Sequence, residues 1–286
     1  MTVRRTAPTI DRTALLQWGL PRLRDLPWRA TRDPWAVLVS EVMLQQTQVA
    51  RVLPKWSAFI TEFPTPAECA DAALGDVLRL WQGLGYPRRA RNLHAAAVEI
   101  DRLGSFPSTL EGLLALPGVG AYTARAVLAF AFEADAAVVD TNIARVLARF
   151  AGQRLTPKHA QTLADTAVPP GESWAWNQCL MDLGAAVCTS ASPECAVCPL
   201  QRRCAWRGRG DDPAVGSAGV SRTQGRFDGS DRQARGHLLR RLGDGGVAAS
   251  DAATVMQRDV AVAARLVDDL VREGLVRRSG GRLLLP

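Results

Sequence analysis

The chain has 286 residues and a formal net charge of +7, with 35 lysines and arginines against 28 aspartates and glutamates. Apolar residues make up 47% of it, which excludes a mainly disordered chain and allows two domains with cores of their own. The basic balance favours a polyanionic partner. No apolar segment follows Met1, and Glu133 and Asp135 interrupt the apolar stretch 126–139. We therefore expect no signal peptide, no membrane span and a cytoplasmic protein.

Apolar residues before Cys204 recur at helical spacing, and alternating strand patterns are nearly absent there. This periodicity predicts helices over residues 9–20, 35–63 with an interruption at Pro54, 67–72, 74–81, 88–103, 110–116, 121–130, 142–151, 157–167 and 174–187. Glycine and proline mark the turns between them. This part of the chain is therefore predicted to be all-α.

The composition changes after Cys204, because residues 207–230 are rich in arginine, glycine, aspartate and serine and contain few large apolar residues. This pattern predicts a linker. The elements predicted beyond it are helices over 231–242, 251–256 and 260–273 and a hairpin over 275–285. Three helices and a hairpin resemble a winged-helix module. Its arginines favour contacts with phosphates, and passive packing is the alternative role.

Four of the six cysteines lie within one short segment, with the spacing C-x6-C-x2-C-x5-C. They are Cys188, Cys195, Cys198 and Cys204. Thiolates bind zinc or an iron–sulfur cluster, and zinc sites more often arrange their ligands as two separated pairs. A single compact loop favours one 4Fe–4S cluster over zinc, and also over four unrelated core cysteines. Disulfides are not expected in a reducing cytosol.

A glycine pair lies between two predicted helices, in the segment 116–124 (LPGVGAYTA). Glycines let the backbone approach a phosphate, and the N–H groups at the start of the next helix favour an anion. A plain turn between helices is the alternative. This element, followed by the cysteine loop, resembles the helix-hairpin-helix DNA glycosylase superfamily. The resemblance implies that Gly118, Val119 and Gly120 bind DNA phosphate.

Removal of a base from its sugar needs an acid that protonates the base and a carboxylate that stabilises positive charge on the sugar. Glu41 lies in the apolar and amide-rich segment 40–49 (SEVMLQQTQV), where burial would keep its carboxyl protonated near neutral pH. Asp140 precedes a predicted helix. Structural roles are the alternative for both residues, as an N-cap for Asp140 and as a satisfied helix-end acid for Glu41.

The segments around Glu41 and Asp140 resemble the two catalytic segments of the adenine DNA glycosylases of the MutY family. The resemblance implies that Glu41 is the general acid, that Asp140 stabilises the transition state, and that Asn142 is the hydrogen-bonding partner of Asp140. Tyr122 falls on a position that helps to hold the catalytic geometry. Residues implied to line the extruded adenine or to contact the opposite base are Trp28, Arg29, Leu44, Gln46, Thr47, Leu84, Tyr86 and Gln178.

Residues 83–86 resemble the wedge loop of this family, in which Tyr86 would stack into the duplex. Pro87 follows at a position where an aromatic or small polar residue is common, and Thr141 replaces a frequent glycine. The resemblance covers residues 15–207. The tail that follows is smaller and less strand-rich than the Nudix-like domain with which the family reads 8-oxoguanine.

The resemblance implies a monofunctional DNA glycosylase of base excision repair, which removes adenine mispaired with 8-oxoguanine or guanine in double-stranded DNA. The first alternative is a bifunctional glycosylase/lyase of the endonuclease III type, but that family carries a Schiff-base lysine at the position of Tyr122. The second is a catalytically inactive iron–sulfur DNA-binding protein, which the presence of Glu41, Asp140 and Asn142 argues against. We expect a monomer, associated with the nucleoid if the source is bacterial.

The expected architecture is an all-α, two-lobed helix-hairpin-helix glycosylase fold with an iron–sulfur cluster loop and a small winged-helix-like C-terminal module. Residues 1–27 and 135–206 are expected to form the iron–sulfur lobe, and 28–134 a helical barrel lobe that carries the hairpin. Residues 207–230 would link them to the module at 231–286. The cleft between the two lobes would receive an extruded base, whose extrusion costs least at a mispair.

Overall fold

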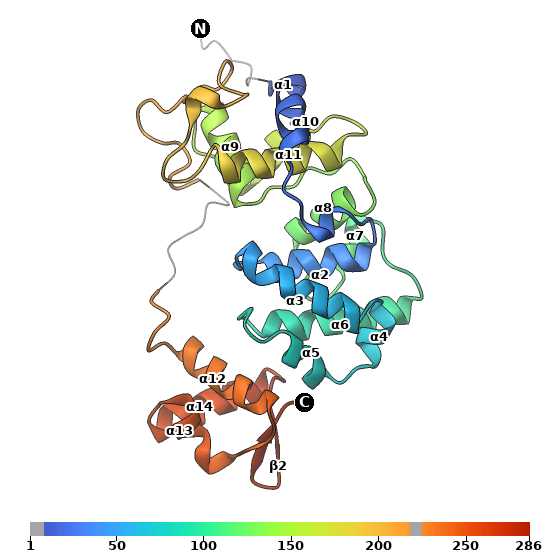
Figure 1. Cartoon of the computed structure of the whole chain (residues 1–286), viewed down its shortest axis with the longest axis vertical. Helices are drawn as coiled ribbons and strands as arrows, with labels where there is room; N and C mark the ends of the chain where they lie inside the picture. The colour runs from blue at the N-terminus through green and yellow to red at the C-terminus, as the bar shows by residue number, and fades with distance from the viewer. Residues whose placement is uncertain (1–8, 218–224) are drawn as a thin grey trace. The chain divides into compact units, whose positions relative to one another are not determined.

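The computed structural model describes residues 9–217 and 225–286, which form two compact units (Figure 1). Helices dominate both units, which confirms the predicted fold class. None of the described helices is long and apolar enough to cross a membrane. The borders predicted for the lobes and the linker stay predictions.

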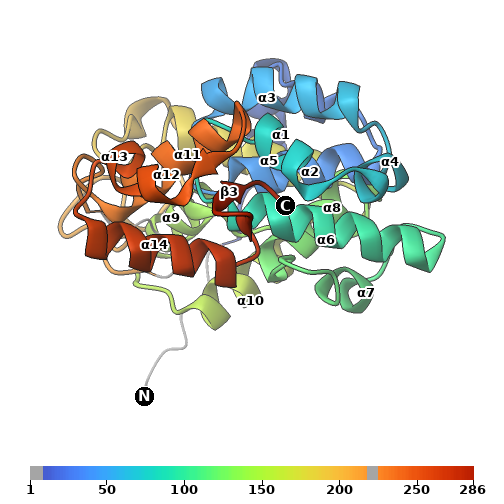
Figure 2. The ribbon, with the colours of Figure 1, turned by 90° about the horizontal axis from the view of Figure 1, so that it is seen from below.

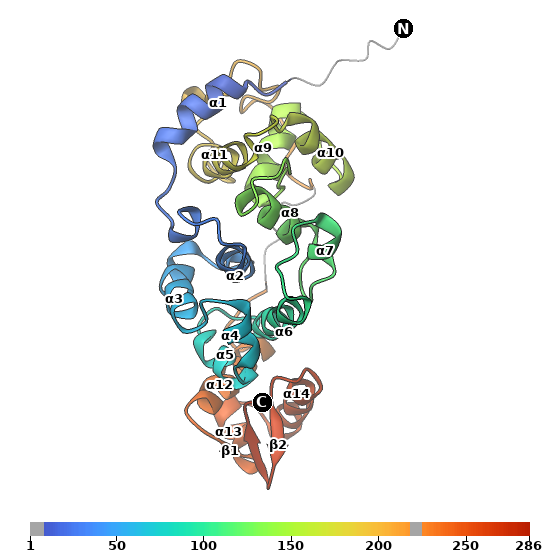
Figure 3. The same cartoon turned by 90° about the vertical axis from the view of Figure 1, so that its right-hand side faces the viewer.

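The first unit, here the cysteine-loop unit, comprises the described residues of 9–37, 108–110 and 120–217. Its helices are α1 (Arg12–Gly19), η1 (Leu20–Arg22), η2 (Pro27–Arg29), α8 (Ala121–Phe130), α9 (Thr141–Ala151), α10 (Pro157–Ala167), α11 (Ser173–Ala186) and η3 (Cys195–Val197). Helix α11 packs against α1, α8 and α9 (Figure 3). Gly184 permits its close approach to α9, because a Cβ at that position would lie 2.7 Å from the Cβ of Asn142.

The second unit, here the winged unit, comprises residues 38–107, 111–119 and the described residues of 223–286. Its helices before the C-terminal region are α2 (Pro34–Leu44, which begins just before the unit), α3 (Val49–Glu62), α4 (Pro66–Asp71), α5 (Leu74–Leu80), α6 (Arg88–Leu103) and α7 (Leu110–Leu114). Helices α4 and α5 pack against α6. In the core, the Phe59 ring meets the rings of Phe63 and Trp81 edge to face.

The C-terminal module of the winged unit contains three α-helices and a small sheet (Figure 2). Its elements are α12 (Asp231–Gly243), β1 (Val247–Ala248), η4 (Ala249–Asp251), α13 (Ala252–Met256), α14 (Val260–Arg272), β2 (Arg277–Ser279) and β3 (Arg282–Leu284). The sheet is antiparallel in the order β1-β3-β2, with Leu283 opposite both Val247 and Arg278. This is the element order of a winged helix, as predicted, and α12 packs against α5.

Two details differ from the sequence-based prediction. The chain breaks between α2 and α3 at residues 45–48, where Gln46 has a φ of 55°, and Pro54 lies inside α3. A proline removes one helical hydrogen bond, but the remaining contacts of α3 keep that helix intact. Strand β1 was not predicted, because two residues carry no alternation and form a strand only by pairing with β3.

The first part of the predicted linker packs against the cysteine-loop unit. Asp212 forms an ion pair with Arg149, and the side chains of Ala214 and Ser217 are buried. Residues 218–224 of the predicted linker lie outside the described residues. Residues 207–217 are therefore part of the folded unit and reach back to α9.

Candidate functional site

Asp140 is the N-cap of α9. One carboxylate oxygen accepts a hydrogen bond from the Ile143 backbone N–H at 2.6 Å, and the other accepts one from the Asn142 side-chain amide at 2.9 Å. Burial raises the pKa of Asp140, and these hydrogen bonds, together with Arg145, oppose that rise. The cap role and a chemical role are compatible, because a desolvated carboxylate interacts strongly with any cation placed beside it.

Arg145 connects this carboxylate network to helix α11 and to the cysteine loop. Its guanidinium donates to the Asn142 side-chain oxygen at 2.8 Å, to the Gly184 carbonyl at 2.6 Å and to the Cys188 carbonyl at 2.7 Å. The structure therefore brings the predicted pair Asp140 and Asn142 together, and the hydrogen bond from Arg145 fixes the Asn142 side chain. The sequence analysis did not identify Arg145, although its position three residues after Asn142 on a helix was a usable signal.

The segment that leads to Asp140 is held by helix α11. The Asn177 side chain accepts from the Val138 N–H at 3.0 Å and donates to the Ala136 carbonyl at 2.9 Å. Ser173 donates to the same carbonyl at 2.8 Å. Buried amides of this kind satisfy backbone groups that have no partner in a helix or sheet. Sequence reasoning missed both side chains.

Gln178 and Trp28, both predicted to line the extruded base, are buried in the cysteine-loop unit. The guanidinium of Arg29, a third such residue, forms a two-pronged ion pair with Asp182 at 2.8 and 2.9 Å. Burial acts to raise the pKa of Asp182, but hydrogen bonds from Arg29 and from Arg24 outweigh it and hold the pKa below its usual value. Asp182, the partner in this ion pair, lies on helix α11, one turn after Gln178. Sequence reasoning also missed Asp182.

Tyr122 is half-buried in the first turn of α8, in the cysteine-loop unit. Glu41 is buried in α2, in the winged unit, with Leu44 at the end of the same helix. The predicted catalytic residues thus divide between the units: Asp140, Asn142 and Tyr122 belong to the first and Glu41 belongs to the second.

The residues predicted to contact the opposite base all belong to the winged unit, where Arg89 of α6 organises them. The two terminal nitrogens of its guanidinium lie 2.7–3.2 Å from six acceptors, which share the four N–H groups of these nitrogens. Their acceptors are the carbonyls of Val42, Met43, Gln45, Leu84 and Gly85 and the hydroxyl of Thr47. Burial lowers the pKa of Arg89 to about 10.

The effect of Arg89 is to join two loops. Its bonds to the last turn of α2 satisfy carbonyls that have no partner within the helix, and its positive charge lies at the negative end of the helix dipole. Its other bonds reach the loop before α6, and the Thr47 hydroxyl also contacts the Leu84 carbonyl at 3.4 Å. Thr47 and Leu84 are thereby held together, and the guanidinium lies over the Tyr86 ring, 5.5 Å from its centroid. Nothing in the sequence pattern singled out Arg89.

The predicted phosphate-binding turn lies between α7 and α8. Gly118 has a φ of 77°, and a Cβ there would lie 2.6 Å from the Cβ of Asn92 on α6, so glycine is required. Gly120 is the N-cap of α8, and a Cβ built on it meets nothing within 4 Å. The start of α8 is therefore accessible at this residue, as contact with a phosphate needs.

The four cysteines of the loop line one small cavity, together with Arg149 and Trp206. None of these four cysteines forms a disulfide in the structure, and burial raises the pKa of the Cys198 thiol to about 11. Within the described ranges, no three cysteine, histidine or acidic side chains converge as ligands of a single metal ion. Four thiols spread around one cavity fit a cluster of several atoms, because such a cluster holds its ligands further apart than one ion does.

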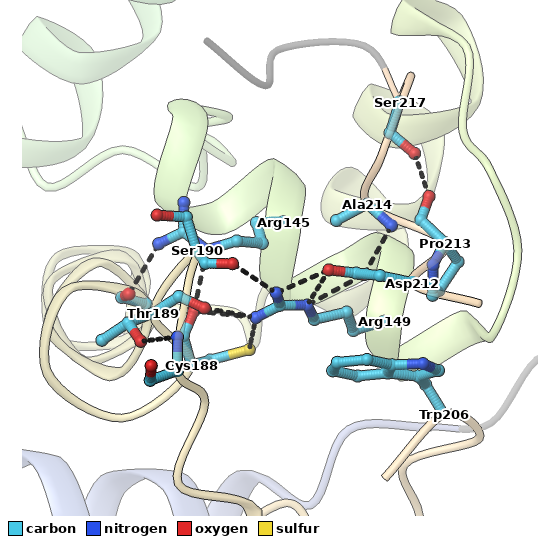
Figure 4. Close-up of polar contacts among 12 residues, drawn as sticks. Arg145, Arg149, Cys188, Thr189, Ser190, Trp206, Asp212, Pro213, Ala214 and Ser217 are labelled. Atoms are coloured by element: carbon cyan, nitrogen blue, oxygen red, sulfur yellow. Dashed lines mark hydrogen bonds and ion pairs between the residues drawn. The ribbon is translucent and has the colours of Figure 1, made fainter. Parts of the chain in front are cut away.

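Arg149 of α9 supplies positive charge beside this cavity (Figure 4). Its guanidinium lies 3.3 Å from the Cys188 sulfur, donates to the Thr189 carbonyl at 2.7 Å and pairs with Asp212 at 2.7 Å. The Trp206 ring stacks on it, with the guanidinium carbon 4.6 Å from the ring centroid. Burial raises the pKa of the Cys188 thiol, and the hydrogen bond and charge of Arg149 oppose that rise without cancelling it.

Cys69 and Cys179 lie apart from the cysteine loop in the sequence and are buried. Burial raises their pKa values to about 12 and about 11, respectively, which is typical of unreactive core thiols.

Comparison with known proteins gives a consistent set of relatives. Residues 39–170 match the HhH-GPD superfamily of base excision DNA repair proteins. An adenine DNA glycosylase of Mycobacterium tuberculosis (strain ATCC 25618 / H37Rv) is 43% identical over 291 residues, which cover 97% of this chain and 94% of that protein. The adenine DNA glycosylase of Homo sapiens is 41% identical over 218 residues, which cover 70% of this chain and 40% of that protein.

Solved structures of DNA glycosylases share the fold. A thermostable thymine-DNA glycosylase superposes with a TM-score of 0.65 at 31% identity, covering 68% of this chain and 94% of its own. A trapped covalent intermediate of endonuclease III with DNA superposes with a TM-score of 0.61 at 25% identity, covering 69% and 95%.

Proposed function

The chain belongs to the adenine DNA glycosylase family of the HhH-GPD superfamily, and we propose that it removes adenine mispaired with guanine or 8-oxoguanine from double-stranded DNA. The enzyme is a hydrolase of base excision repair that cleaves the bond between a base and its sugar. The observation that carries the proposal is the half-buried Asp140 carboxylate, held by Asn142 and, through it, by Arg145.

In the proposed mechanism, Glu41 protonates the leaving adenine and Asp140 stabilises the positive charge that develops on the sugar. Burial makes the ionised form of Asp140 costly, and a cationic sugar in front of it relieves that cost. The hydrogen bonds from Asn142 and the Ile143 N–H keep the carboxylate in one orientation. Asn142 and Arg145 act as positioning residues.

We further propose that the enzyme is monofunctional. Tyr122 occupies the position at which an endonuclease III-like enzyme carries its Schiff-base lysine, and a phenol cannot form a Schiff base. Water is then the final nucleophile, and the product is an intact strand with an abasic site. Borohydride reduction should trap no covalent protein–DNA adduct. Efficient trapping would favour the bifunctional alternative.

The proposed cofactor is a 4Fe–4S cluster held by the four cysteines of the loop. It supports the loop as a structural crosslink, and Arg149 provides compensating charge beside Cys188. The proposed DNA contacts include the turn 118–120 at the start of α8. A cytoplasmic, monomeric enzyme acting at the nucleoid fits these proposals.

The substrate proposal is tested with purified full-length protein and duplexes that carry adenine opposite each normal base and opposite 8-oxoguanine. Alkali then cleaves any abasic site. We expect cleavage only after alkali, and only for adenine opposite guanine or 8-oxoguanine. Excision of oxidised pyrimidines in place of adenine, or no excision at all, would overturn the proposal.

A further inference from the structure

The C-terminal module is fixed to the helices that carry the loop 83–86. The Glu273 carboxylate accepts hydrogen bonds from Arg88 of α6 at 2.6 Å and from Arg235 of α12 at 2.5 Å. The hydrogen bonds from Arg88 and Arg235 hold the pKa of Glu273 at about 2. One half-buried carboxylate thus joins α6 to α12 across a large separation in sequence.

Backbone contacts reinforce this docking. The Gly75 N–H, at the start of α5, donates to the Pro286 carbonyl at 3.0 Å. Arg79 of α5 donates to the Gly243 carbonyl at 3.3 Å, and Arg91 of α6 donates to the Glu273 carbonyl at 2.5 Å. These bonds lie within one compact unit, so α12 has a defined position relative to α5 and α6.

That position places Arg232 against Tyr86. The guanidinium of Arg232 donates to the Tyr86 hydroxyl at 3.2 Å and to the Gly225 carbonyl at 2.8 Å. Tyr86 is 39% exposed and has a φ of 49°, a conformation that a non-glycine residue adopts only when its surroundings hold it. Arg89 lies over the other part of the same ring, 5.5 Å from the centroid. Arg232 thus gives Tyr86 a support that comes from the C-terminal module.

Most other arginines of the module have partners of their own. Arg235 pairs with Glu273, Arg265 with Asp231, and Arg278 with Asp268, while Arg277 and Arg282 donate to backbone carbonyls. The three ion pairs offset part of the positive charge of the module, whereas Arg277 and Arg282 keep their charge, because a carbonyl does not neutralise a guanidinium. Arg232 differs from these arginines, because its guanidinium contacts Tyr86 in the proposed wedge loop.

We infer that Arg232 is a positioning residue for Tyr86, and that the C-terminal module thereby contributes to discrimination of the base opposite the adenine. This inference rests on the proposed function, because Tyr86 would act at that base. Loss of the Arg232 contact would remove one of the restraints on the Tyr86 side chain, and the preference for one opposite base over another would fall. A residue that binds only phosphate would instead change the affinity for every duplex alike.

The test compares Arg232→Gln, Arg232→Lys and the control Arg240→Gln in full-length protein. Arg240 is exposed on the same helix and carries the same charge. The measurements are affinities and single-turnover excision rates for duplexes with adenine opposite 8-oxoguanine, guanine and cytosine. We expect Arg232→Gln to reduce the preference for 8-oxoguanine over guanine about tenfold, the effect of one lost charge-assisted hydrogen bond. Arg232→Lys should restore most of it, and Arg240→Gln should leave it unchanged.

Amide hydrogen exchange of residues 83–86 in the free protein separates this inference from the proposed function. Arg232→Gln should speed exchange there, and Arg240→Gln should not. If the wild type excised no adenine from any duplex, the proposed function would fail while the exchange experiment still tested the contact. Unchanged exchange, or an equal loss of affinity for all duplexes with preference intact, would overturn the role given to Arg232.

Discussion

The substitution Arg89→Gln should destabilise the winged unit and loosen the segments that contact the opposite base. The two terminal nitrogens of Arg89 share six acceptors at the end of α2, at Thr47 and in the loop before α6. Hydrogen bonds from a charged donor contribute roughly 1.5–3 kcal/mol each, and they are not additive when they share one donor group. Glutamine removes the charge together with the donors, so the groups left without a partner are neutral carbonyls and no unpaired charge remains. We therefore expect the free energy of unfolding to fall by roughly 1.5–3 kcal/mol.

Urea unfolding followed by tryptophan fluorescence measures this loss. Trp81 is a suitable reporter, because the Arg89 guanidinium lies 5.4 Å from its ring centroid. Arg89→Lys should recover part of the stability, since an ammonium keeps the charge but offers three donors without the planar fork of arginine. The matched control is Arg102→Gln at the other end of α6, where an exposed pair with Glu99 should contribute nothing measurable.

The excision rates of duplexes with different bases opposite the adenine give a second measure of the role of Arg89. Because its bonds hold Thr47 and Leu84, the preference between opposite bases should weaken in Arg89→Gln at temperatures where the variant is still folded. An Arg89→Gln variant as stable as Arg102→Gln, with its preference intact, would refute the claim that this side chain organises the loops.

Three further predictions concern the chemistry, the cluster and the pH response. Glu41→Gln should abolish excision while mispair binding persists, and Asp140→Asn should lose most activity; excision at the parental rate by either would remove its assigned role. Purified protein should contain iron and sulfide, and Cys198→Ser should lower both; zinc alone on metal analysis would contradict the cluster. Because the pKa of Glu273 lies at about 2 in the fold, below its usual 4.5, its stabilising effect is present above pH 4.5 and is lost as the pH falls toward 2. The difference in unfolding free energy between wild type and Glu273→Gln should shrink over that range, and a difference constant with pH would contradict the docking role.

Local sequence determined most of the secondary structure. Helix α6 spans the predicted residues 88–103 and ends at Gly104 in the left-handed conformation, and α8 spans the predicted 121–130. Thr65 and Glu68 form a capping box at the start of α4. These signals act within a few residues of one another, so they can be read from the chain alone. The spacing of the four cysteines in residues 188–204 is local in the same sense, and it indicated that these side chains would lie together, as they do around one cavity.

Tertiary structure decided what holds the site together. Arg89 bonds to carbonyls more than 40 residues away, Arg145 reaches Cys188 from another helix, and Glu273 joins α6 to α12. Backbone carbonyls exist at every residue, so no sequence pattern indicates which of them an arginine will meet. Strand β1 likewise exists only because β3 lies beside it. Side chains with catalytic chemistry could be predicted from residue type and motif, whereas the side chains that position them depend on contacts that form only when distant segments pack.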